Sequence, residues 1–273
     1  MSDPTAAPPP PADPGQWGDL TTRLISGAVI AIGSLAALWA GGLWFQMLVI
    51  AATALMIWEV WTMVAPDRAA HGSFVAVLTA VLLFGVAELD TGLALLLLLI
   101  VPAAGLTLSS ERGWLFLLFS AGIVFAGWGL IVFRQELGIS WTLWLVLVVA
   151  ASDVAGYFAG RTIGGPKFWP SISPKKTWSG TIAGWLAAAA LGLIFVIATD
   201  AGPSLILLSV IACFAGQMGD IVQSALKRRM GVKDSSDLIP GHGGVYDRFD
   251  ALMGATLVML VLTIGLQFAG GLG

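Results

Sequence analysis

Long apolar stretches separated by short polar ones run along most of this chain of 273 residues. Most of them approach or exceed the roughly 20 residues that an α-helix needs to cross a bilayer. The third and fourth stretches are short, and Pro102 is expected to kink the fourth. The predicted spans are approximately 24–42, 43–65, 73–89, 91–108, 114–133, 141–161, 180–198, 203–226 and 250–269. The predicted fold class is all-α, a polytopic integral membrane helix bundle of about nine transmembrane helices.

The composition excludes a soluble protein. The mean hydropathy is +0.91, and hydrophobic residues make up 58% of the chain against 11% charged residues. So few charges cannot cover one large apolar core with polar surface. Cys213 is the single cysteine, so neither an intrachain disulfide nor a cysteine-based zinc site is expected.

The placement of basic residues predicts the orientation in the membrane. With nine spans, the N-terminus shares one side with the loops near 66–72, 109–113, 162–179 and 227–249. Twelve basic residues fall on that side and only Arg134 on the other, which together account for all 13. The positive-inside rule places the crowded side in the cytoplasm. The twelve are Arg23, Arg68, Arg112, Arg161, Lys167, Lys175, Lys176, Lys227, Arg228, Arg229, Lys233 and Arg248.

The chain divides into three predicted parts. Residues 1–20 are rich in Pro and Ala without Lys or Arg, which indicates a disordered cytoplasmic tail rather than a signal peptide. Residues 21–135 are expected to form a transmembrane scaffold, and residues 136–273 a catalytic transmembrane region. Glu59, late in the second span, is interpreted as a solvated or snorkelling carboxylate. Nearby Trp61 is interpreted as an interfacial anchor, like other Trp residues at span ends.

The first of three polar blocks lies in the sixth span, at residues 151–165. Asp153, Tyr157 and Arg161 are spaced to share one helical face. A carboxylate inside a membrane span usually faces the bundle interior or a cavity. Gly156 and Gly160 form a pattern of small residues that allows close helix approach. On its own, this block fits a structural Asp–Arg pair as well as a functional site.

The second block, residues 173–180, reads SPKKTWSG. It brings Lys175, Lys176 and Thr177 to the beginning of a helix expected near Gly180. Free backbone N–H groups and the helix dipole favour anions at such a position. Without other evidence, however, two lysines in a cytoplasmic loop are explained by topology alone.

The third block extends from residue 216 to residue 250. Asp220, Ser224 and Lys227 or Arg228 are spaced to lie on one helical face. The sequence continues through Lys233 to a Pro-Gly-His-Gly-Gly turn, residues 240–244, in which the backbone can adopt positive φ and approach a ligand closely. Asp247, Arg248 and Asp250 follow at the beginning of the last span. This concentration of charge between apolar segments does not resemble an ordinary solvated loop.

The residue types in these blocks favour one chemistry. Carboxylates with few His and no usable Cys favour a hard cation such as Mg²⁺. Clustered Lys and Arg favour polyphosphate, and glycine-rich turns offer backbone N–H groups to phosphate oxygens. A cation with basic residues is typical of phosphoryl or nucleotidyl transfer. At a membrane face, one substrate can be a soluble nucleotide and the other a lipid.

The segment SALKRRMGVKDSSDLIPGHGGVYDRFD, residues 224–250, closely resembles the signature of phosphatidate cytidylyltransferases, also called CDP-diacylglycerol synthases. DVAGYFAGR, residues 153–161, and SPKKTW, residues 173–178, resemble the same family in the same order. The motifs cover about residues 130–270. The resemblance implies that the phosphate of phosphatidic acid attacks the α-phosphorus of CTP, giving CDP-diacylglycerol and pyrophosphate for phospholipid biosynthesis.

The resemblance also implies roles for residues. Asp220 and Asp247 are expected to bind Mg²⁺, and whether a second cation, monovalent or divalent, binds beside it is left open. Asp220, Asp247, Lys227 and Arg248 are the expected catalytic residues. Those expected to bind substrate or order the loop are Asp153, Arg161, Lys175, Lys176, Thr177, Ser224, Arg228, Lys233, His242, Gly243 and Gly244. The sequence departs from the family at Ser179 and Gln223, where Glu is usual, and both changes remove a negative charge near the expected metal. The glutamates of the family are interpreted as supporting groups, because both aspartates expected to bind the metal remain; the alternative is a weaker or differently balanced metal affinity in this chain.

The implied partners are CTP, phosphatidic acid and membrane lipids, without nucleic acid. A homodimer is expected from the family and from Gly156 and Gly160. The expected location is the cytoplasmic (inner) membrane, with the active site facing the cytoplasm. Two alternatives remain: a CTP-dependent lipid kinase or cytidylyltransferase with another acceptor, and an ion-coupled transporter using Asp153 and Asp220. The absence of an internal repeat in the sequence argues against the transporter.

Overall fold

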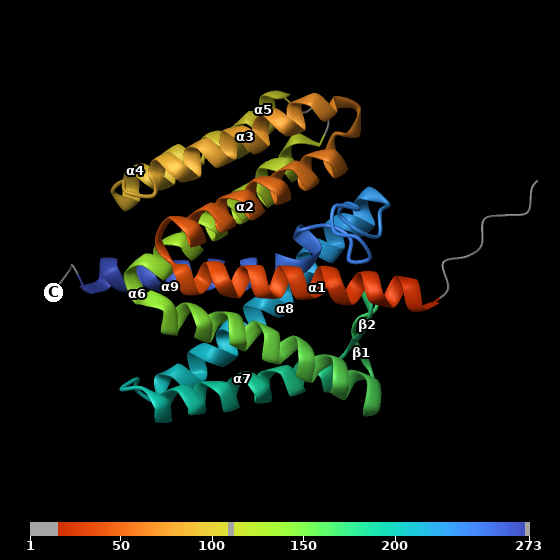
Figure 1. Cartoon of the computed structure of the whole chain (residues 1–273), viewed down its shortest axis with the longest axis vertical. Helices are drawn as coiled ribbons and strands as arrows, with labels where there is room; N and C mark the ends of the chain where they lie inside the picture. Colours follow the sequence, from red (N-terminus) through yellow and green to blue (C-terminus); the bar gives the residue numbers. More distant parts are fainter. Residues whose placement is uncertain (1–15, 109–111, 271–273) are drawn as a thin grey trace, which may run out of the picture.

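Figure 1 presents the fold as a computed structural model, which describes residues 16–108 and 112–270. The described residues form an almost entirely helical bundle with one small hairpin. Its elements are α1 (Gln16–Ala40), α2 (Gly42–Val64), η1 (Pro66–Arg68), α3 (Ala69–Val86), α4 (Thr91–Leu98), α5 (Ile100–Leu108), α6 (Gly113–Thr162), β1 (Lys167–Trp169), β2 (Ser173–Thr177), α7 (Trp178–Ala198), α8 (Ser204–Met230) and α9 (Tyr246–Gly270). The predicted tail lies outside the described residues up to residue 15, and α1 begins at Gln16.

The predicted fold class is confirmed. In the described part of the chain, eight helical segments are long and apolar enough to cross a membrane. One of them, α6, has 50 residues and is interrupted at Gly138, whose φ of 82° and ψ of −174° are not helical. Figure 1 shows α6 reversing direction near one end of the bundle. Counted as two crossings, α6 brings the total to the nine predicted. The hinge at Gly138 lies between the two spans predicted at 114–133 and 141–161.

Two apolar cores hold the bundle together. One is built by α2 to α5 with the first half of α6, and includes the fully buried Met56, Trp61 and Phe116. The other joins the second half of α6 to α7 and α8 through residues such as Trp144 and Leu145. Helix α9 contributes to both cores, Met253 to the first and Met259 to the second. The last helix therefore joins the two halves of the molecule.

The interfacial role predicted for Trp61 is wrong. Its side chain is fully buried, it lies edge-on to Phe116, and its Nε1 donates to the carbonyl oxygen of Arg68 at 2.9 Å. Its position late in α2 resembles that of an anchor in sequence. Because the η1 turn folds back over it, the indole lies in the core instead.

Gly156 and Gly160 allow a close helix approach, as predicted, but within one chain. A Cβ on Gly156 would lie 3.3 Å from the carbonyl oxygen of Gly180 in α7, and one on Gly160 would lie 3.0 Å from Oγ1 of Thr177. These glycines therefore join α6 to α7. They give no support to a homodimer, which keeps only the family resemblance as its basis.

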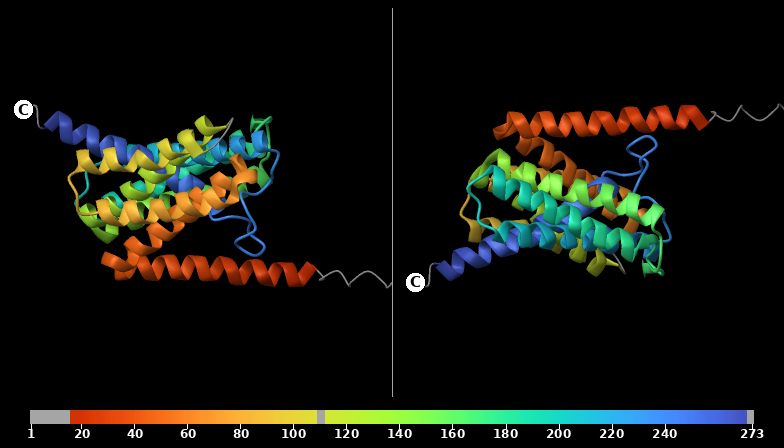
Figure 2. Two further views of the ribbon diagram at one scale, coloured as in Figure 1. Left: turned by 90° about the horizontal axis from the view of Figure 1, so that it is seen from above. Right: turned by 90° about the horizontal axis from the view of Figure 1, so that it is seen from below.

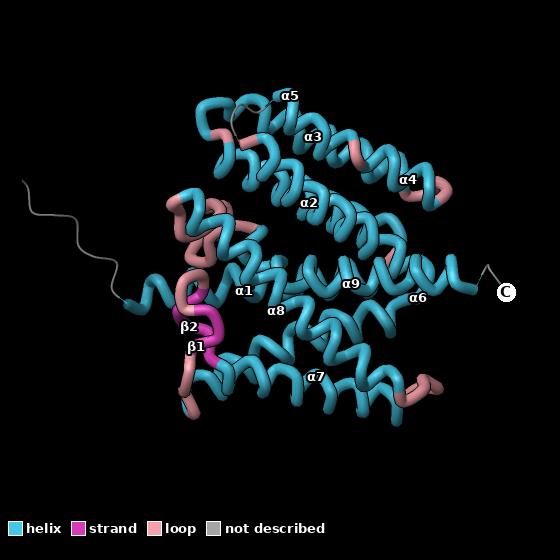
Figure 3. Tube along the Cα trace, turned by 180° about the vertical axis from the view of Figure 1, so that it is seen from behind, coloured by secondary structure: helices cyan, strands magenta, loops and turns pink. Residues whose placement is uncertain are grey.

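Helix α1 lies at the periphery of the bundle (Figure 2). At its end, the guanidinium of Arg134 donates to the carbonyl oxygen of Leu38, with Nη2 at 3.2 Å. Near its beginning, Ser26 Oγ lies 2.7 Å from Nδ1 of His242. The hairpin and the loop between α8 and α9 lie together at the end of the bundle where α1 begins (Figure 3).

Candidate active site at one end of the bundle

The β1–β2 hairpin positions the lysines of the second block. Lys167 pairs with Thr177 and Trp169 with Ser173 in an antiparallel ladder, which the sequence did not predict. Thr177 then becomes the N-cap of α7, because its hydroxyl accepts the backbone N–H of Gly180 at 3.2 Å. Lys175 and Lys176 are therefore held by a strand on one side and a capped helix on the other.

An open cavity of about 370 Å³ lies beside this hairpin. It gathers five predicted site residues from α6 and the hairpin: Asp153, Arg161, Lys175, Lys176 and Thr177. The Arg161 guanidinium donates to the hydroxyl of Tyr157 at 2.6 Å, and no Asp153–Arg161 ion pair occurs among the described residues. The face predicted for α6 therefore lines a cavity that holds charged side chains, instead of forming an internal ion pair.

Lys176 links this cavity to α8. Its Nζ lies 2.6 Å from Oδ2 of Asp220, in an ion pair whose side chains are 26% and 32% exposed. Ser224 donates to Oδ1 of the same carboxylate at 3.2 Å. Asp153 is close enough to both Lys176 and Asp220 to interact with them electrostatically. The predicted Asp220–Ser224 face of α8 therefore meets the lysine of the hairpin.

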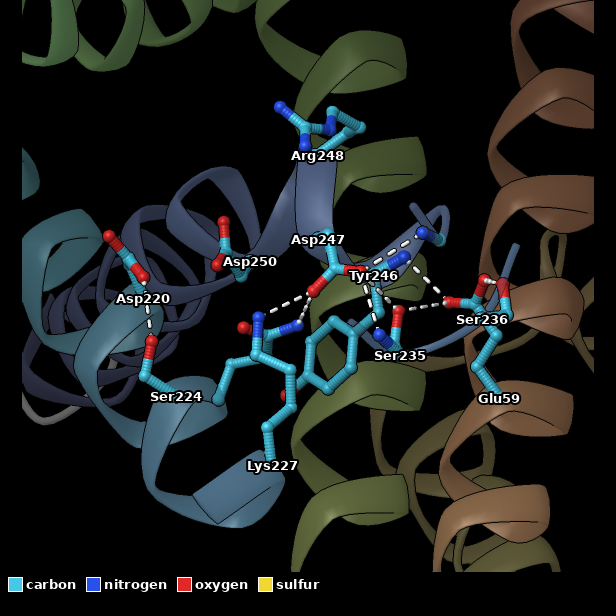
Figure 4. A network of polar contacts seen from close by, with 12 residues as sticks. Glu59, Asp220, Ser224, Lys227, Ser235, Ser236, Tyr246, Asp247, Arg248 and Asp250 are labelled. Atoms are coloured by element: carbon cyan, nitrogen blue, oxygen red, sulfur yellow. Dashed lines mark hydrogen bonds and ion pairs between the residues drawn. The ribbon is translucent and has the colours of Figure 1, made fainter. Parts of the chain in front are cut away.

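A second lysine–carboxylate pair lies deeper. Nζ of Lys227 and Oδ1 of Asp247 are 2.6 Å apart, with the side chains only 12% and 4% exposed. Gln223 Nε2 donates to the same oxygen at 2.7 Å. Oδ2 of Asp247 accepts the N–H and the hydroxyl of Ser235 and the N–H of Gly244, at 2.7, 2.9 and 2.9 Å. Figure 4 shows the donors converging on this carboxylate from α8 and from both ends of the loop.

Figure 4 shows Asp250 between Asp220 and Asp247, in the first turns of α9. Asp250 interacts electrostatically with Asp220, Lys227 and Asp153. Helices α8 and α9 approach closely here, because a Cβ on Gly254 would lie 2.9 Å from the Cα of Gly219. An apolar groove of about 610 Å³, lined by Asp250, lies between α6, α8 and α9. Helix α8 contributes Gln217 to the cavity beside the hairpin and Val222 to this groove, so α8 separates the two.

The loop from Gly231 to Val245 is closed by its own backbone. Ile239 and Gly243 form a bridge, and the positive φ predicted for this turn occurs at Gly241 and Gly243, at 74° and 83°. The Arg248 guanidinium donates to the carbonyl oxygen of His242, with Nε at 3.0 Å. The predicted residues His242 and Arg248 therefore organise the loop tip, which contacts α1 through the hydrogen bond between His242 and Ser26.

The remaining predicted site residues differ in their surroundings. Arg228 and Lys233 are exposed and form no side-chain hydrogen bond or ion pair within the described residues. Ser179 donates to the carbonyl oxygen of Gly164 at 2.5 Å, so it closes the turn after α6. Gln223 is fully buried, and its amide gives Asp247 a hydrogen-bond donor that a carboxylate would lack. Both departures from the family pattern therefore make supporting contacts.

The interpretation of Glu59 as a solvated carboxylate is wrong. Its side chain is fully buried and accepts four hydrogen bonds from the loop and from the beginning of α9. Ser235 Oγ and Ser236 Oγ donate at 3.2 and 2.5 Å, and the N–H groups of Val245 and Tyr246 donate at 2.8 and 2.7 Å. The signal available in the sequence was a single acid in an apolar span, which indicates a partner elsewhere in the chain.

The carboxylates differ in how well they suit a metal ion. In the part of the chain that the structure describes, no three acidic, His or Cys side chains are grouped closely enough to hold one. Asp220 fits a hard cation, because its partly exposed oxygens face one lysine and one hydroxyl. Four donors, together with the Ser235 hydroxyl that Asp247 shares with Glu59, already fill the roughly four acceptor directions of the Asp247 carboxylate. Asp247 can therefore reach a cation only by releasing a donor.

This geometry defines an integral membrane protein with a lysine- and carboxylate-rich site at one end of a helix bundle, beside an apolar groove. The sequence profile of the cytidylyltransferase family matches residues 21–265, and the chain belongs to this family. A relative from Brucella suis biovar 1 (strain 1330), called phosphatidate cytidylyltransferase, is 36% identical over 257 residues, which cover 88% of this chain and 92% of the relative. One of the same name from Bacillus subtilis (strain 168) is 39% identical over 122 residues, 44% of this chain and 45% of the relative.

Proposed function

We propose that this chain transfers the cytidylyl group of CTP to phosphatidic acid, forming CDP-diacylglycerol and releasing pyrophosphate. Membership of the family and the printed name of its relatives support this reaction. The observation that carries the proposal is the arrangement around α8, which has a cavity with Arg161, Lys175 and Lys176 on one side and an apolar groove on the other. The two lysine–carboxylate pairs of Asp220 and Asp247 lie on or against the same helix. Such a site suits a soluble polyanion and a lipid that must meet at one point.

The basic residues of the cavity would bind and orient the triphosphate. Arg161, Lys175 and Lys176 offer charge-assisted hydrogen bonds to phosphate oxygens. The attacking phosphate of the lipid is already anionic near neutral pH, so no strong general base is required. One bond forms between its oxygen and the α-phosphorus, and the bond from that phosphorus to the pyrophosphate oxygen breaks. Orientation and charge neutralisation then account for most of the catalysis.

We also propose Mg²⁺ as the cofactor, held by Asp220, with Asp247 joining when a donor is released. The ion would neutralise charge on the triphosphate. Lys176, displaced from Asp220 at that moment, would become free to bind a phosphate oxygen. Lys227 and Gln223 hold Asp247 in position meanwhile. A second cation, the homodimer, the division into scaffold and catalytic region, and a cytoplasmic-facing site in the inner membrane remain predictions beside this one.

The test uses the purified chain in detergent–lipid micelles. Pyrophosphate release from CTP is expected to require both phosphatidic acid and Mg²⁺. Asp220→Asn and Asp247→Asn are expected to lower the rate by roughly 10²–10³-fold, the usual effect of removing a group that stabilises transition-state charge. Asp200→Asn is the matched control, because Asp200 is exposed in the turn between α7 and α8, away from the site. Release without phosphatidic acid, or only with an isoprenoid alcohol, would contradict the proposed acceptor.

A further inference from the structure

Glu59 connects the first half of the chain to the loop of the site. It lies in α2, and the structure provides no cationic partner for it among the described residues. All four of its hydrogen-bond donors lie in residues 235–246. An apolar side chain would be less costly to bury at this depth than an acid. The presence of a carboxylate therefore calls for an explanation beyond packing.

The four donors lie at the two ends of one loop. Ser235 and Ser236 stand near its beginning, and Val245 and Tyr246 stand where it enters α9. The carboxylate thus ties the loop ends together and accepts the free N–H groups at the beginning of α9, as a helix cap does from within the chain. The contact is close: a Cβ on Gly244 would overlap the Glu59 carboxyl group and Ser235 Oγ.

Ser235 connects the Glu59 carboxylate to Asp247. Its hydroxyl lies 3.2 Å from Oε2 of Glu59 and 2.9 Å from Oδ2 of Asp247, and its N–H donates to the same Asp247 oxygen at 2.7 Å. Figure 4 shows Ser235 between the two carboxylates. A shift of the loop ends at Glu59 must therefore move two or more of the donors that hold Asp247, and with them the partner of Lys227.

We propose that Glu59 is a positioning residue of the active site: it fixes both ends of the 231–245 loop and thereby sets the position of Asp247 and Lys227. Glu59 touches neither cavity, so it acts through Ser235 and Gly244. This role rests on the proposed cytidylyl transfer for its kinetic consequence. The loop closure itself is independent of that reaction and can be measured without it.

The kinetic test compares Glu59→Gln with Glu59→Asp and Thr53→Val. The amide keeps the size of the side chain but presents N–H groups to four donors. Glu59→Gln is expected to lower kcat by about 10–100-fold with KM for CTP changed less than threefold, because displaced catalytic groups slow reaction more than binding. Glu59→Asp keeps the charge and should recover part of kcat. Thr53, also fully buried in α2, donates its hydroxyl to Val49 of its own helix and has no other hydrogen bond within residues 16–108 and 112–270, so Thr53→Val should leave kcat unchanged.

The structural test measures loop closure by thiol labelling. Cys213 is buried within the bundle, and Val245, 8% exposed, lies at the loop end bound by Glu59. In Val245→Cys, a maleimide should label residue 245 slowly. Adding Glu59→Gln should raise that rate at least fivefold without changing labelling of Cys213.

The outcomes separate the two proposals. An equal rise at both thiols, or no rise at residue 245, would overturn the positioning role, as would an active Glu59→Gln protein with native kcat. Faster labelling at residue 245 in a folded chain that never transfers cytidylyl groups would leave loop closure by Glu59 established. The lack of cytidylyl transfer would overturn the proposed reaction, and with it the proposed effect of Glu59 on catalysis.

Discussion

At the scale of single residues, the two lysine–carboxylate pairs have the same length but different surroundings. Lys227–Asp247 is almost wholly buried, whereas Lys176–Asp220 is about a quarter to a third exposed. Removing one partner of a buried pair leaves an uncompensated charge, while an exposed pair contributes little to stability. The first pair therefore supports the structure of the site, and the second is the one that a ligand can open.

This difference predicts opposite balances of stability and activity. Lys227→Met is expected to lower the free energy of unfolding by about 3 kcal/mol, because Asp247 remains buried without its cation. Lys176→Met is expected to cost about 1 kcal/mol or less, yet to weaken CTP binding strongly. Thermal unfolding in micelles and KM for CTP would check both. Equal losses of stability in the two variants would contradict this distinction.

Most of the site residues predicted from the sequence lie near one another in the structure, but the sequence did not predict how they are paired. Spacing on a helix correctly placed Asp220 beside Ser224, because helical geometry is local. The pairing of Lys176 with Asp220 and of Lys227 with Asp247 depends on where the hairpin and α9 dock, which no local pattern encodes. The contacts of Glu59 could not be predicted for the same reason, since its nearest hydrogen-bond donor in the sequence is 176 residues away.

At the scale of elements, the crossing of α8 and α9 fixes the site. It requires glycine on both helices, because a Cβ on Gly254 would meet backbone atoms of Ala215 and Gly219. Backbone cannot move aside as a side chain can. Hydropathy predicted the spans but not the point at which α8 and α9 cross. Glycines in this chain also occur where no other atom is near, so a glycine in the sequence does not by itself indicate a helix contact.

Gly254→Ala is therefore expected to force α8 and α9 apart. Overpacking of this kind costs about 1–3 kcal/mol, and the rate of pyrophosphate release should fall as Asp247 on α9 moves away from Lys227 on α8. Gly85→Ala, in α3, is the matched control, because no atom lies within 4 Å of the added methyl group. Thermal unfolding and activity would be compared for the two variants. A Gly254→Ala protein as stable and active as the control would show that the helices can separate freely.

At the scale of the whole molecule, the nine crossings place the described ends of α1 and α9 on opposite sides of the bundle (Figure 1). The hairpin, the 231–245 loop and the beginning of α1 share one end, as the count of nine spans predicted. Counting spans constrains every loop, because each span needs a minimum length and successive loops must alternate between the two sides. The count could not predict that the two halves of α6 meet directly at Gly138, without a loop between them.

The orientation can be tested with two matched serine substitutions. Ser171 is exposed in the β1–β2 turn, and Ser204 is exposed at the beginning of α8, on the opposite end. In intact bacterial cells, a membrane-impermeant maleimide is expected to label Ser204→Cys directly and Ser171→Cys only after permeabilisation. The native chain serves as the blank, because Cys213 is buried. The reverse pattern would place the site outside the cell.

The separation of Glu59 from its donors has a consequence for biosynthesis. Ser235, the first of them, is made 176 residues after it. At roughly 5–20 residues per second, that delay is about 9–35 s. During this time the Glu59 carboxyl group in α2 lacks the four hydrogen-bond donors that it has in the finished protein. A nascent chain that stops before its last two helices keeps that acid unsatisfied, so the same side chain that closes the finished site also distinguishes unfinished molecules from complete ones.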